Sequence, residues 1–244
     1  MRNVLVTGGS RGIGLGIALK MAAAGYCAIV IARKESSELT SAMGGGAPDQ
    51  SAALRFVAAD LAEIEALPDL VKRVRKEFGP IYGLVNNAGT SAEGALALMH
   101  TSQIERVVRL NTLSPIVLTK YAVRCMMADG GGRVVNIASI VATTGYSGLA
   151  AYSATKASMI GFTRSLAREV GRMNVNVNAV SPGFVDTDLT QSLAEEDRQR
   201  IIRRSALHRM VDVADVANAV EFLMSDAAKN ITGTVLTVDA GNTA

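Results

Sequence analysis

Short apolar runs alternate with longer amphipathic segments along the whole chain, and this alternation limits the fold more than any other feature. Runs typical of buried strands occupy residues 3–7, 28–32, 54–58, 81–85, 133–137, 175–180 and 235–238. Helical patterns lie between them, at residues 12–24, 36–50 (a short helix and a loop), 64–78, 101–128, 151–170 and 213–224. Strands joined by such helices form right-handed βαβ units. The sequence therefore predicts an α/β fold, with a parallel sheet covered by helices on both faces.

Length and charge narrow the class of protein. A chain of 244 residues can bury a substantial core, and no linker divides it, so we expect a single domain over residues 1–244. The net charge of +3 is small, and no long basic block with interleaved aromatic residues suggests nucleic acid. The first apolar run, residues 4–6, is too short for a signal peptide, and no run is long enough to span a membrane. We expect a cytoplasmic enzyme that binds neither nucleic acid nor membrane.

The two cysteines do not indicate a disulfide or a metal site. Cys27 and Cys125 lie in apolar or helical surroundings, which favours buried free thiols over a cross-link. No cluster of cysteine and histidine residues has the spacing of metal ligands, so no metal is expected.

A glycine-rich loop joins the first predicted strand to the first predicted helix. Its glycines permit a tight turn, a close approach of the backbone to a pyrophosphate, and close packing of the helix. The N-terminal N–H groups of that helix can bind phosphate. The spacing differs from G-x-G-x-x-G, but the position in the fold predicts nucleotide binding over a plain turn. The predicted contacts are Gly8, Ser10, Arg11, Gly12, Ile13 and Gly14.

The end of the second predicted strand distinguishes the two nicotinamide cofactors. A protein that binds NAD usually has an acidic residue there, which accepts a hydrogen bond from the ribose 2′-hydroxyl. This chain has Arg33 followed by Lys34, and Arg11 adds a cation from the glycine-rich loop. Two cations suit a 2′-phosphate, although Glu35 follows directly and a solvated loop charge is the alternative. The sequence favours NADP(H).

Tyr152 and Lys156 are four residues apart, and Ser139 precedes Tyr152 by thirteen residues. One helical turn places the phenol and the ammonium on the same face, where the cation is expected to lower the pKa of the phenol. Such a group can give or take a proton near neutral pH, as carbonyl reduction or alcohol oxidation requires. An ordinary pair on a helix surface is the alternative for these two residues alone.

Taken together, the Thr7–Gly14 loop, Asn86-Asn87-Ala88-Gly89, Asn111, Ser139, Tyr152/Lys156 and Pro182-Gly183 resemble the short-chain dehydrogenase/reductase family in order and spacing. The resemblance covers essentially the whole chain. It implies one Rossmann-type domain with a doubly wound, seven-stranded parallel sheet, commonly assembled as a homotetramer.

The resemblance also implies roles for the matching residues. Tyr152 would donate the proton in a reduction, and Lys156 would lower its pKa and hold the nicotinamide ribose. Ser139 would bind the substrate carbonyl oxygen, and Asn111 would hold a water in a proton relay. The alternatives are that Asn111 pins a helix and that Asp60 is a turn residue. The further implied cofactor contacts are Asp60, Leu61, Asn87, Ala88, Gly89, Pro182, Gly183, Val185 and Thr187.

Within the family, residues 165–170, 182–190 and 217–223 are most similar to 3-oxoacyl-acyl-carrier-protein reductases. Two stretches depart from that group. Residues 90–93 read Thr-Ser-Ala-Glu instead of Ile-Thr-Arg-Asp, and residues 128–132 lack the basic side chains that often precede the fifth strand, where a carrier protein docks.

The resemblance implies reduction of a 3-oxoacyl thioester, linked to acyl carrier protein or coenzyme A, or of a related ketone. The alternatives are a dehydrogenase of a secondary alcohol in secondary-metabolite or steroid metabolism, and a nucleotide-sensing regulator. A regulator does not need Ser139, Tyr152 and Lys156, and all three are present.

Two further patterns remain open. The segment after Pro182-Gly183 contains Arg198, Arg200, Arg203 and Arg204, which either form a solvated helix face or meet the phosphates of a thioester substrate. An apolar stripe in the predicted helix 151–170 either belongs to the core or is buried between subunits. The stripe consists of Met159, Phe162, Leu166 and Val170.

Replacing Arg33 with aspartate is expected to shift cofactor preference from NADPH toward NADH. The substitution puts a carboxylate where a 2′-phosphate would be repelled, and the same carboxylate can accept a hydrogen bond from a free 2′-hydroxyl. The ratio of kcat/KM for the two cofactors measures the shift, and an unchanged ratio would remove Arg33 from the cofactor assignment.

Overall fold

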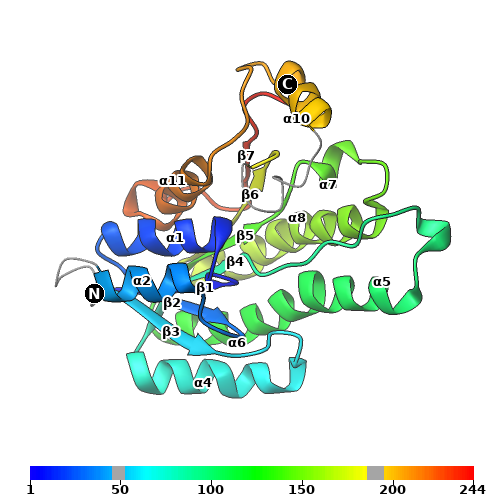
Figure 1. Ribbon diagram of the computed structural model, residues 1–244. Helices are drawn as coiled ribbons and strands as arrows, with labels where there is room; N and C mark the ends of the chain where they lie inside the picture. The colour runs from blue at the N-terminus through cyan, green and yellow to red at the C-terminus, as the bar shows by residue number, and fades with distance from the viewer. Residues whose placement is uncertain (46–52, 186–194) are drawn as a thin grey trace.

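The computed structural model describes residues 1–45, 53–185 and 195–244, and in it a single parallel sheet runs through the molecule (Figure 1). The sheet has seven strands in the order β3-β2-β1-β4-β5-β6-β7. This is the predicted doubly wound, Rossmann-type arrangement. The strands are β1 Asn3–Thr7, β2 Cys27–Ala32, β3 Leu54–Ala58, β4 Ile81–Asn86, β5 Gly132–Ile137, β6 Val175–Pro182 and β7 Val235–Val238.

The strand order changes direction between β1 and β4. Leu5 of β1 pairs with Ile29 of β2 on one side and with Leu84 of β4 on the other, although β4 comes more than fifty residues after β2 in the chain. The loops that follow β1 and β4 therefore leave the carboxyl edge of the sheet in opposite directions. A crevice at such a point is where open α/β sheets bind their ligands.

Helices cover both faces of the sheet (Figure 1). Helices α1, α2 and α11 cover the face that we call the α1 face, and α4, α6 and α8 cover the opposite face, the α8 face. Helix α10 stands above the sheet beside the C-terminus. The helices are α1 Gly12–Ala23, α2 Ser37–Gly45, α4 Leu67–Phe78, α5 Thr101–Val108, α6 Ser114–Ala128, α7 Val141–Thr144, α8 Ala150–Val170, α10 Glu195–Arg204 and α11 Val213–Met224.

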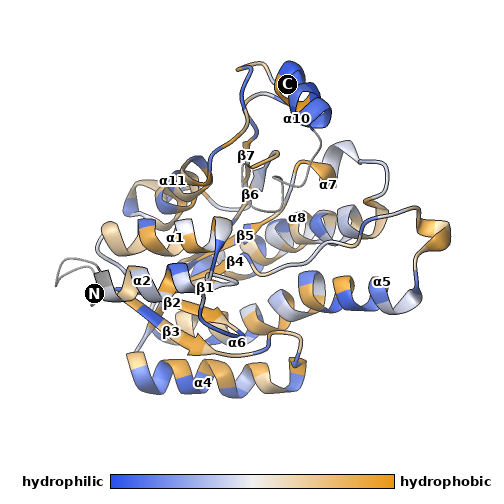
Figure 2. Cartoon of the chain, in the orientation of Figure 1, coloured by the Kyte–Doolittle hydropathy of each residue, from blue (hydrophilic) through white to orange (hydrophobic). Residues whose placement is uncertain are grey.

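The core has two layers because strand residues alternate between the two faces. In β1, Val4 and Val6 pack on the α1 face, and Leu5 packs on the α8 face. All three side chains are fully buried. Strands buried on both sides are apolar almost throughout, which is why the central strands are hydrophobic in Figure 2 and why their runs stand out in the sequence.

The predicted helix over residues 101–128 is interrupted. Helix α5 ends at Val108, a π-helical turn spans Arg109–Leu113, and α6 begins at Ser114. Pro115 explains the break, because it has no N–H to donate to the carbonyl of Asn111 four residues earlier. The extra residue of a π turn re-aims the side chains around it, and such turns are frequent at functional sites.

A chain of buried polar side chains ties the strands to the α8 face. The Asn86 amide donates to Thr119 Oγ1 and to Asn136 Oδ1, each over 2.8 Å. Asn136 in turn donates to Thr163 Oγ1 of α8 over 2.8 Å. Asn86 Oδ1 is buried and has no hydrogen-bond partner in the described part of the chain. These bonds fix the ends of β4 and β5 against α6 and α8.

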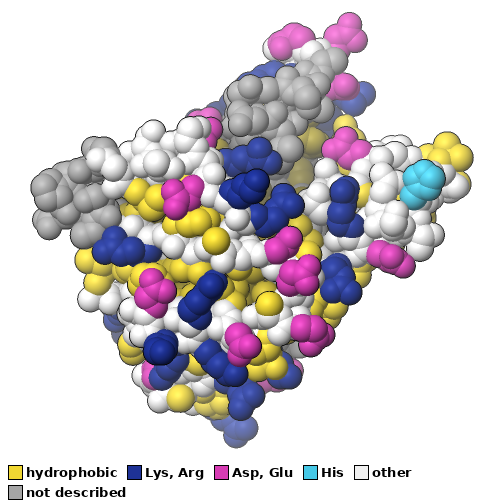
Figure 3. All heavy atoms as spheres, turned by 60° about the horizontal axis from the view of Figure 1, so that its bottom comes forward, with side chains coloured by type: hydrophobic (Ala, Val, Ile, Leu, Met, Phe, Trp, Pro, Cys, Tyr) yellow, Lys and Arg dark blue, Asp and Glu magenta, His cyan; other side chains and the backbone are white. Residues whose placement is uncertain are grey.

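The surface shows no single-sign field on the face in Figure 3, where Lys and Arg are interspersed with Asp and Glu. Cys27 is buried and Cys125 half-buried, and both are free thiols. Among the described residues, no helix is both long and apolar enough to cross a membrane.

Gly16 allows α1 to pack closely against α11, and its replacement by alanine is expected to be destabilising. A Cβ at Gly16 would lie 2.2 Å from Cγ1 of Val213, a β-branched side chain with little freedom to move away. Overpacking of this kind costs roughly 1–3 kcal/mol, which outweighs the gain in helix propensity. Urea denaturation measures the loss.

Val213→Ala provides the matched test, because the new methyl would then lie 3.6 Å from the remaining Cβ of residue 213. The double variant should be more stable than the sum of the two single changes implies. Strictly additive effects would mean that the two helices do not meet through this contact.

Candidate active site

Thr7, at the end of β1, joins the loop that follows β1 to the loop that follows β4. Its hydroxyl donates to the carbonyl of Val85 over 3.1 Å and accepts from the N–H groups of Asn87 (2.9 Å) and Ala88 (3.0 Å). The Asn87 side chain donates back to the carbonyl of Thr7 over 2.9 Å. Thr7 was not predicted as a site residue, although its place directly before the glycines is the signal that would have identified it.

The glycine-rich loop lies directly against the loop after β4. A Cβ at Gly8 would lie 2.9 Å from Cα of Ala88, and one at Gly14 would lie 2.4 Å from Nδ2 of Asn87. Gly8 also has a φ of +65°, a left-handed conformation that side chains rarely adopt. Both positions thus require glycine, and their backbone forms a narrow cradle.

The N-terminus of α1 opens onto this cradle. Arg11 caps the helix without a side-chain hydrogen bond, and Gly12 is exposed with open space around its Cα. Ser10 precedes them, while Ile13 packs its side chain against the core of the α1 face. An uncapped helix N-terminus favours a negatively charged group, because free N–H groups and the helix dipole both point toward it.

Two cations lie near the cradle. Arg33 follows β2 and Arg11 precedes α1, and both side chains are exposed. The two loops touch, because the Ser36 hydroxyl donates to the carbonyl of Ser10. The structure therefore brings the two predicted cations to adjoining loops.

Asp60 and Leu61 follow β3. The Asp60 carboxylate is exposed, accepts from the N–H of Ala62 over 2.9 Å, and lines a hollow of about 460 Å³. This is also the geometry of the turn residue that the sequence left as an alternative. The Leu61 side chain is buried in the core of the α8 face, so only its main chain is available to a ligand.

Ser139, Tyr152 and Lys156 meet beyond the end of β5. Helix α8 carries both Tyr152 and Lys156, and the Tyr152 phenol is hydrogen-bonded to Ser139. Lys156 Nζ donates to the carbonyl of Ile137 over 2.8 Å and lies 5.7 Å from the centre of the Tyr152 ring. The predicted grouping of the three residues is therefore present.

The expected direction of the pKa shift at Tyr152 is wrong for this structure. Burial raises the pKa of Tyr152 above its ordinary value, and the hydrogen bond to Ser139 only partly offsets this. Burial also lowers the pKa of Lys156 to about 8. Desolvation is the largest cause of the pKa shift in both groups, and it outweighs the effect that spacing alone predicted.

Asn111, in the π turn, is 2% exposed and faces Thr90 and α8. Its Oδ1 accepts from the N–H of Thr90 over 2.9 Å, and its Nδ2 donates to the Thr90 carbonyl (2.8 Å) and to Thr155 Oγ1 (3.1 Å). A Cβ at Gly89 would lie 3.3 Å from Asn111 Oδ1 and 3.7 Å from Lys156 Nζ. Asn111 and Lys156 thus both border the small space beside the Cα of Gly89, which a side chain at residue 89 would fill.

Pro182 and Gly183 end β6 next to the Ser139 segment. The carbonyl of Pro182 accepts from the N–H of Ile140 over 3.0 Å, and a Cβ at Gly183 would lie 2.9 Å from Cα of Asp239. Val185 is 5% exposed and pairs with Val211, so its side chain faces the protein interior. Thr187 lies outside the described residues.

Two aromatic residues near these segments were not predicted. The rings of Tyr146 and Phe184 meet edge to face, with centres 5.7 Å apart. Tyr146 comes between Ser139 and Tyr152, and Phe184 directly follows Gly183. Their positions in the chain were the available signal.

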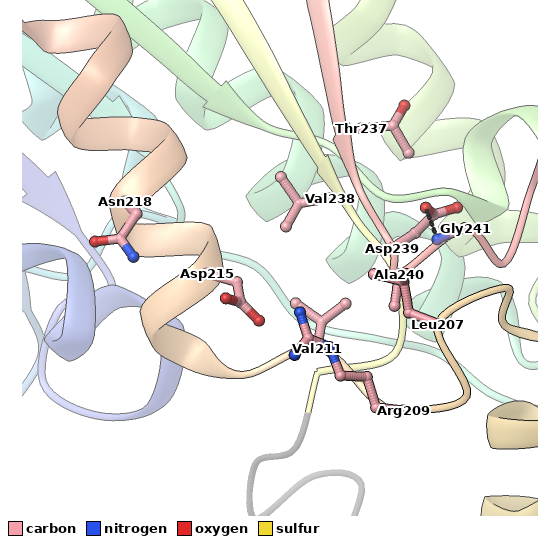
Figure 4. Close-up of a pocket in the computed structure, with 10 residues that line it drawn as sticks. All are labelled: Leu207, Arg209, Val211, Asp215, Asn218, Thr237, Val238, Asp239, Ala240 and Gly241. Atoms are coloured by element: carbon pink, nitrogen blue, oxygen red, sulfur yellow. Dashed lines mark hydrogen bonds between the residues drawn. The ribbon is translucent and has the colours of Figure 1, made fainter.

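A separate hollow of about 410 Å³ lies between α11 and the end of β7 (Figure 4). None of the residues selected from the sequence lines it. Its two carboxylates are already bonded: Asp215 accepts from the N–H of Asp212, and Asp239 accepts from the N–H of Gly241 and from Thr243. We therefore place the candidate site at the loops that follow β1, β4 and β5, where the residues selected from the sequence gather.

The four arginines after β6 lie on α10. Arg200 is paired with Asp197 over 2.8 Å, and Arg198 is half-buried. Arg203 and Arg204 are exposed, and neither forms an ion pair with another described residue. Arg200 therefore belongs to a solvated helix face. For Arg203 and Arg204, both a solvated face and a contact with substrate phosphates stay open.

Comparisons with known proteins agree with this architecture. A family model described as Enoyl-(Acyl carrier protein) reductase matches residues 8–243. The 3-oxoacyl-[acyl-carrier-protein] reductase FabG of Escherichia coli (strain K12) is 39% identical over 242 residues, which are 97% of this chain and 95% of the relative. The reductase MabA of Mycobacterium tuberculosis (strain ATCC 25618 / H37Rv) is 38% identical over 240 residues, covering 98% and 92%.

A solved structure has the same fold. It is a gluconate 5-dehydrogenase from Burkholderia cenocepacia J2315 in complex with NADP and tartrate. It aligns with a TM-score of 0.93 and 28% identity over 99% of this chain and 95% of its own. The chain belongs to the short-chain dehydrogenase/reductase family.

The buried ammonium of Lys156 gives a stability prediction with a defined pH window. Because its pKa is about 8 in the fold and 10.5 as the ordinary value, the unfolded chain binds the proton more tightly. The charged lysine therefore destabilises the fold fully below pH 8, and this cost disappears as the pH rises toward 10.5.

Lys156→Met should accordingly be more stable than wild type at neutral pH, apart from the lost hydrogen bond to Ile137. Its advantage should shrink by up to about 3 kcal/mol as the pH rises through this window. Urea denaturation of both proteins across the window measures this, and a constant difference would show that Lys156 keeps its ordinary pKa.

Proposed function

We propose that this protein is an NADPH-dependent reductase that converts a 3-oxoacyl thioester, or a related ketone, to the 3-hydroxy product. The observation that carries the proposal is the grouping of Ser139, Tyr152 and Lys156 beside the glycine cradle. In this proposal the whole chain, residues 1–244, acts as one catalytic domain.

The cradle and its cations fit the cofactor. The uncapped N-terminus of α1 suits a pyrophosphate, and the exposed Arg11 and Arg33 suit a 2′-phosphate. The gluconate 5-dehydrogenase structure, which is in complex with NADP, supports the same choice. Bound NADPH would supply a hydride to the carbonyl carbon. The remaining proposed contacts are Gly8, Ser10, Gly12, Ile13, Gly14, Asp60, Leu61, Asn87, Ala88, Gly89, Pro182, Gly183, Val185 and Thr187.

The protein's own groups would manage the proton. Ser139 donates a hydrogen bond to the substrate oxygen, and Tyr152 gives that oxygen its proton. The raised pKa of Tyr152 keeps the phenol protonated at neutral pH, which is the form a donor needs. As negative charge develops on the phenol oxygen, the Lys156 ammonium stabilises it, and the space between Lys156 and Asn111 offers the proton a path to water.

The proposed substrate class rests on the similarity to the 3-oxoacyl-[acyl-carrier-protein] reductases. Attachment of the substrate to acyl carrier protein or coenzyme A is part of the proposal. Residues 128–132 lack basic groups, and Asp129 is paired with Arg75. We therefore propose Arg203 and Arg204 as the contacts to the phosphates. A second candidate is oxidation of a secondary alcohol, which the similarity to gluconate 5-dehydrogenase favours.

We also propose a cytoplasmic homotetramer. Of the apolar stripe on α8, Met159 and Val170 are buried within the chain itself, so they belong to the core. Phe162 and Leu166 are only partly buried and are the members that a neighbouring subunit can cover. Light scattering at micromolar concentration tests this, and a monomeric mass would refute it.

Tyr152→Phe should reduce turnover by about a hundred- to ten-thousand-fold, because it removes the general acid. Cofactor affinity should stay nearly unchanged. The assay follows loss of NADPH absorbance with acetoacetyl thioesters and small ketones. Tyr121→Phe on α6 is the matched control and should keep full activity. A Tyr152 variant with more than about a tenth of wild-type activity would exclude this phenol as the acid.

Reversing Arg203 and Arg204 to glutamate should raise KM for an acetoacetyl thioester of coenzyme A more than KM for a small uncharged ketone. The reason is that phosphate contacts are charge-assisted and the ketone has no phosphate. Equal effects on both substrates, or none, would favour a free ketone substrate and leave these arginines as surface charge.

A further inference from the structure

Thr155 connects the helix that carries Tyr152 and Lys156 to the π turn that carries Asn111. Its side chain is 2% exposed. The hydroxyl donates to the main-chain carbonyl of Tyr152 over 2.7 Å and accepts from Asn111 Nδ2 over 3.1 Å. A threonine hydroxyl has one proton, and the Tyr152 carbonyl receives it. Toward Asn111 it can therefore only accept, which fixes which end of the Asn111 amide faces α8.

This bond completes the hydrogen bonding of the Asn111 amide. One Nδ2 proton goes to Thr155 and the other to the Thr90 carbonyl, while Oδ1 accepts from the Thr90 N–H. Without the Thr155 hydroxyl, one buried N–H of Asn111 would have no acceptor among the described residues. A buried donor left unpaired is costly, so the amide is expected to turn away in search of another acceptor.

The orientation of that amide bears on the candidate active site. Asn111 Oδ1 and Lys156 Nζ both lie within 4 Å of the point where a Cβ of Gly89 would be. A rotation of the Asn111 amide would therefore change the shape and polarity of the space next to the Lys156 ammonium. Thr155 is not among the nearest neighbours of that point, so any effect of Thr155 on the space would pass through its hydrogen bond to Asn111.

We propose that Thr155 is a positioning residue for the reduction proposed above, on which this inference depends. Its hydroxyl holds Asn111 in the orientation that lets a proton pass between Lys156 and water. It thereby links the geometry of the π turn to the protonation of Tyr152.

Thr163 on the same helix is a closely matched control. It is fully buried, its hydroxyl donates to the carbonyl of Met159 over 2.7 Å, and it accepts from the side-chain amide of Asn136 over 2.8 Å. Thr155 and Thr163 thus have the same chemistry, the same burial and an asparagine partner. Only Thr155 contacts Asn111.

The test compares Thr155→Val, Thr155→Ser and Thr163→Val. Thr155→Val should lower kcat about ten- to a hundredfold, as small displacements in an active site do, with KM for NADPH nearly unchanged and an altered pH profile of kcat. Thr155→Ser keeps the hydroxyl and should restore most of the activity. Thr163→Val should lower the Tm by a similar amount and leave kcat and its pH profile unchanged. If Thr155→Val fails to fold, Thr155→Ala removes the same hydroxyl and is read in its place.

Equal kcat values for the two valine variants would overturn the proposal and leave Thr155 with a structural role alone. An inactive wild type would instead contradict the proposed reductase function. A second readout then decides on Thr155: hydrogen exchange at the Thr90 amide, which donates to Asn111 Oδ1. The proposal expects this exchange to accelerate in Thr155→Val and not in Thr163→Val, and equal protection in both would overturn it.

Discussion

The three hydrogen bonds of the Thr7 hydroxyl hold together the two strand ends on which the site depends. The strand order reverses between β1 and β4, which is the point at which open α/β sheets bind their ligands. Thr7 joins these two strand ends by bonding to Val85, Asn87 and Ala88. The glycine cradle then fits against Asn87 and Ala88 with no room for a side chain at Gly8 or Gly14. The two glycines are what allow the two loops to approach each other this closely.

Burial has the largest effect on the charges of Lys156 and Tyr152. It raises the pKa of Tyr152 and lowers the pKa of Lys156, so it favours the neutral form of each group. A raised pKa suits a proton donor, because it keeps the Tyr152 phenol protonated before the reaction. As the phenol gives up its proton, the nearby Lys156 ammonium stabilises the negative charge on the phenol oxygen. The hydrogen bond from Lys156 to the carbonyl of Ile137 also anchors the ammonium to the end of β5.

Much of this arrangement could be predicted from the sequence, because the features concerned are local. Buried parallel strands are continuous apolar runs, and Tyr152 and Lys156 lie one helical turn apart, so pattern and spacing suffice. The π turn could not be predicted from the sequence. The sequence predicted one helix across Pro115, and the position of the extra residue depends on the contacts of Asn111 with Thr90 and Thr155. The predicted lowering of the Tyr152 pKa was wrong for a related reason: burial raises this pKa, and burial depends on tertiary packing that no spacing rule contains.

In the proposed reaction, a nicotinamide cofactor and a ketone meet at Ser139 and Tyr152. Transfer of deuterium from NADPH labelled at C4 of the nicotinamide tests it most directly, with acetoacetyl thioester as substrate and mass spectrometry of the product. When the label is on one of the two faces of the nicotinamide, we expect deuterium at the carbon that carried the ketone, with no exchange with water. Unlabelled 3-hydroxy product from NADPH labelled on either face, or no product with any ketone tested, would contradict it.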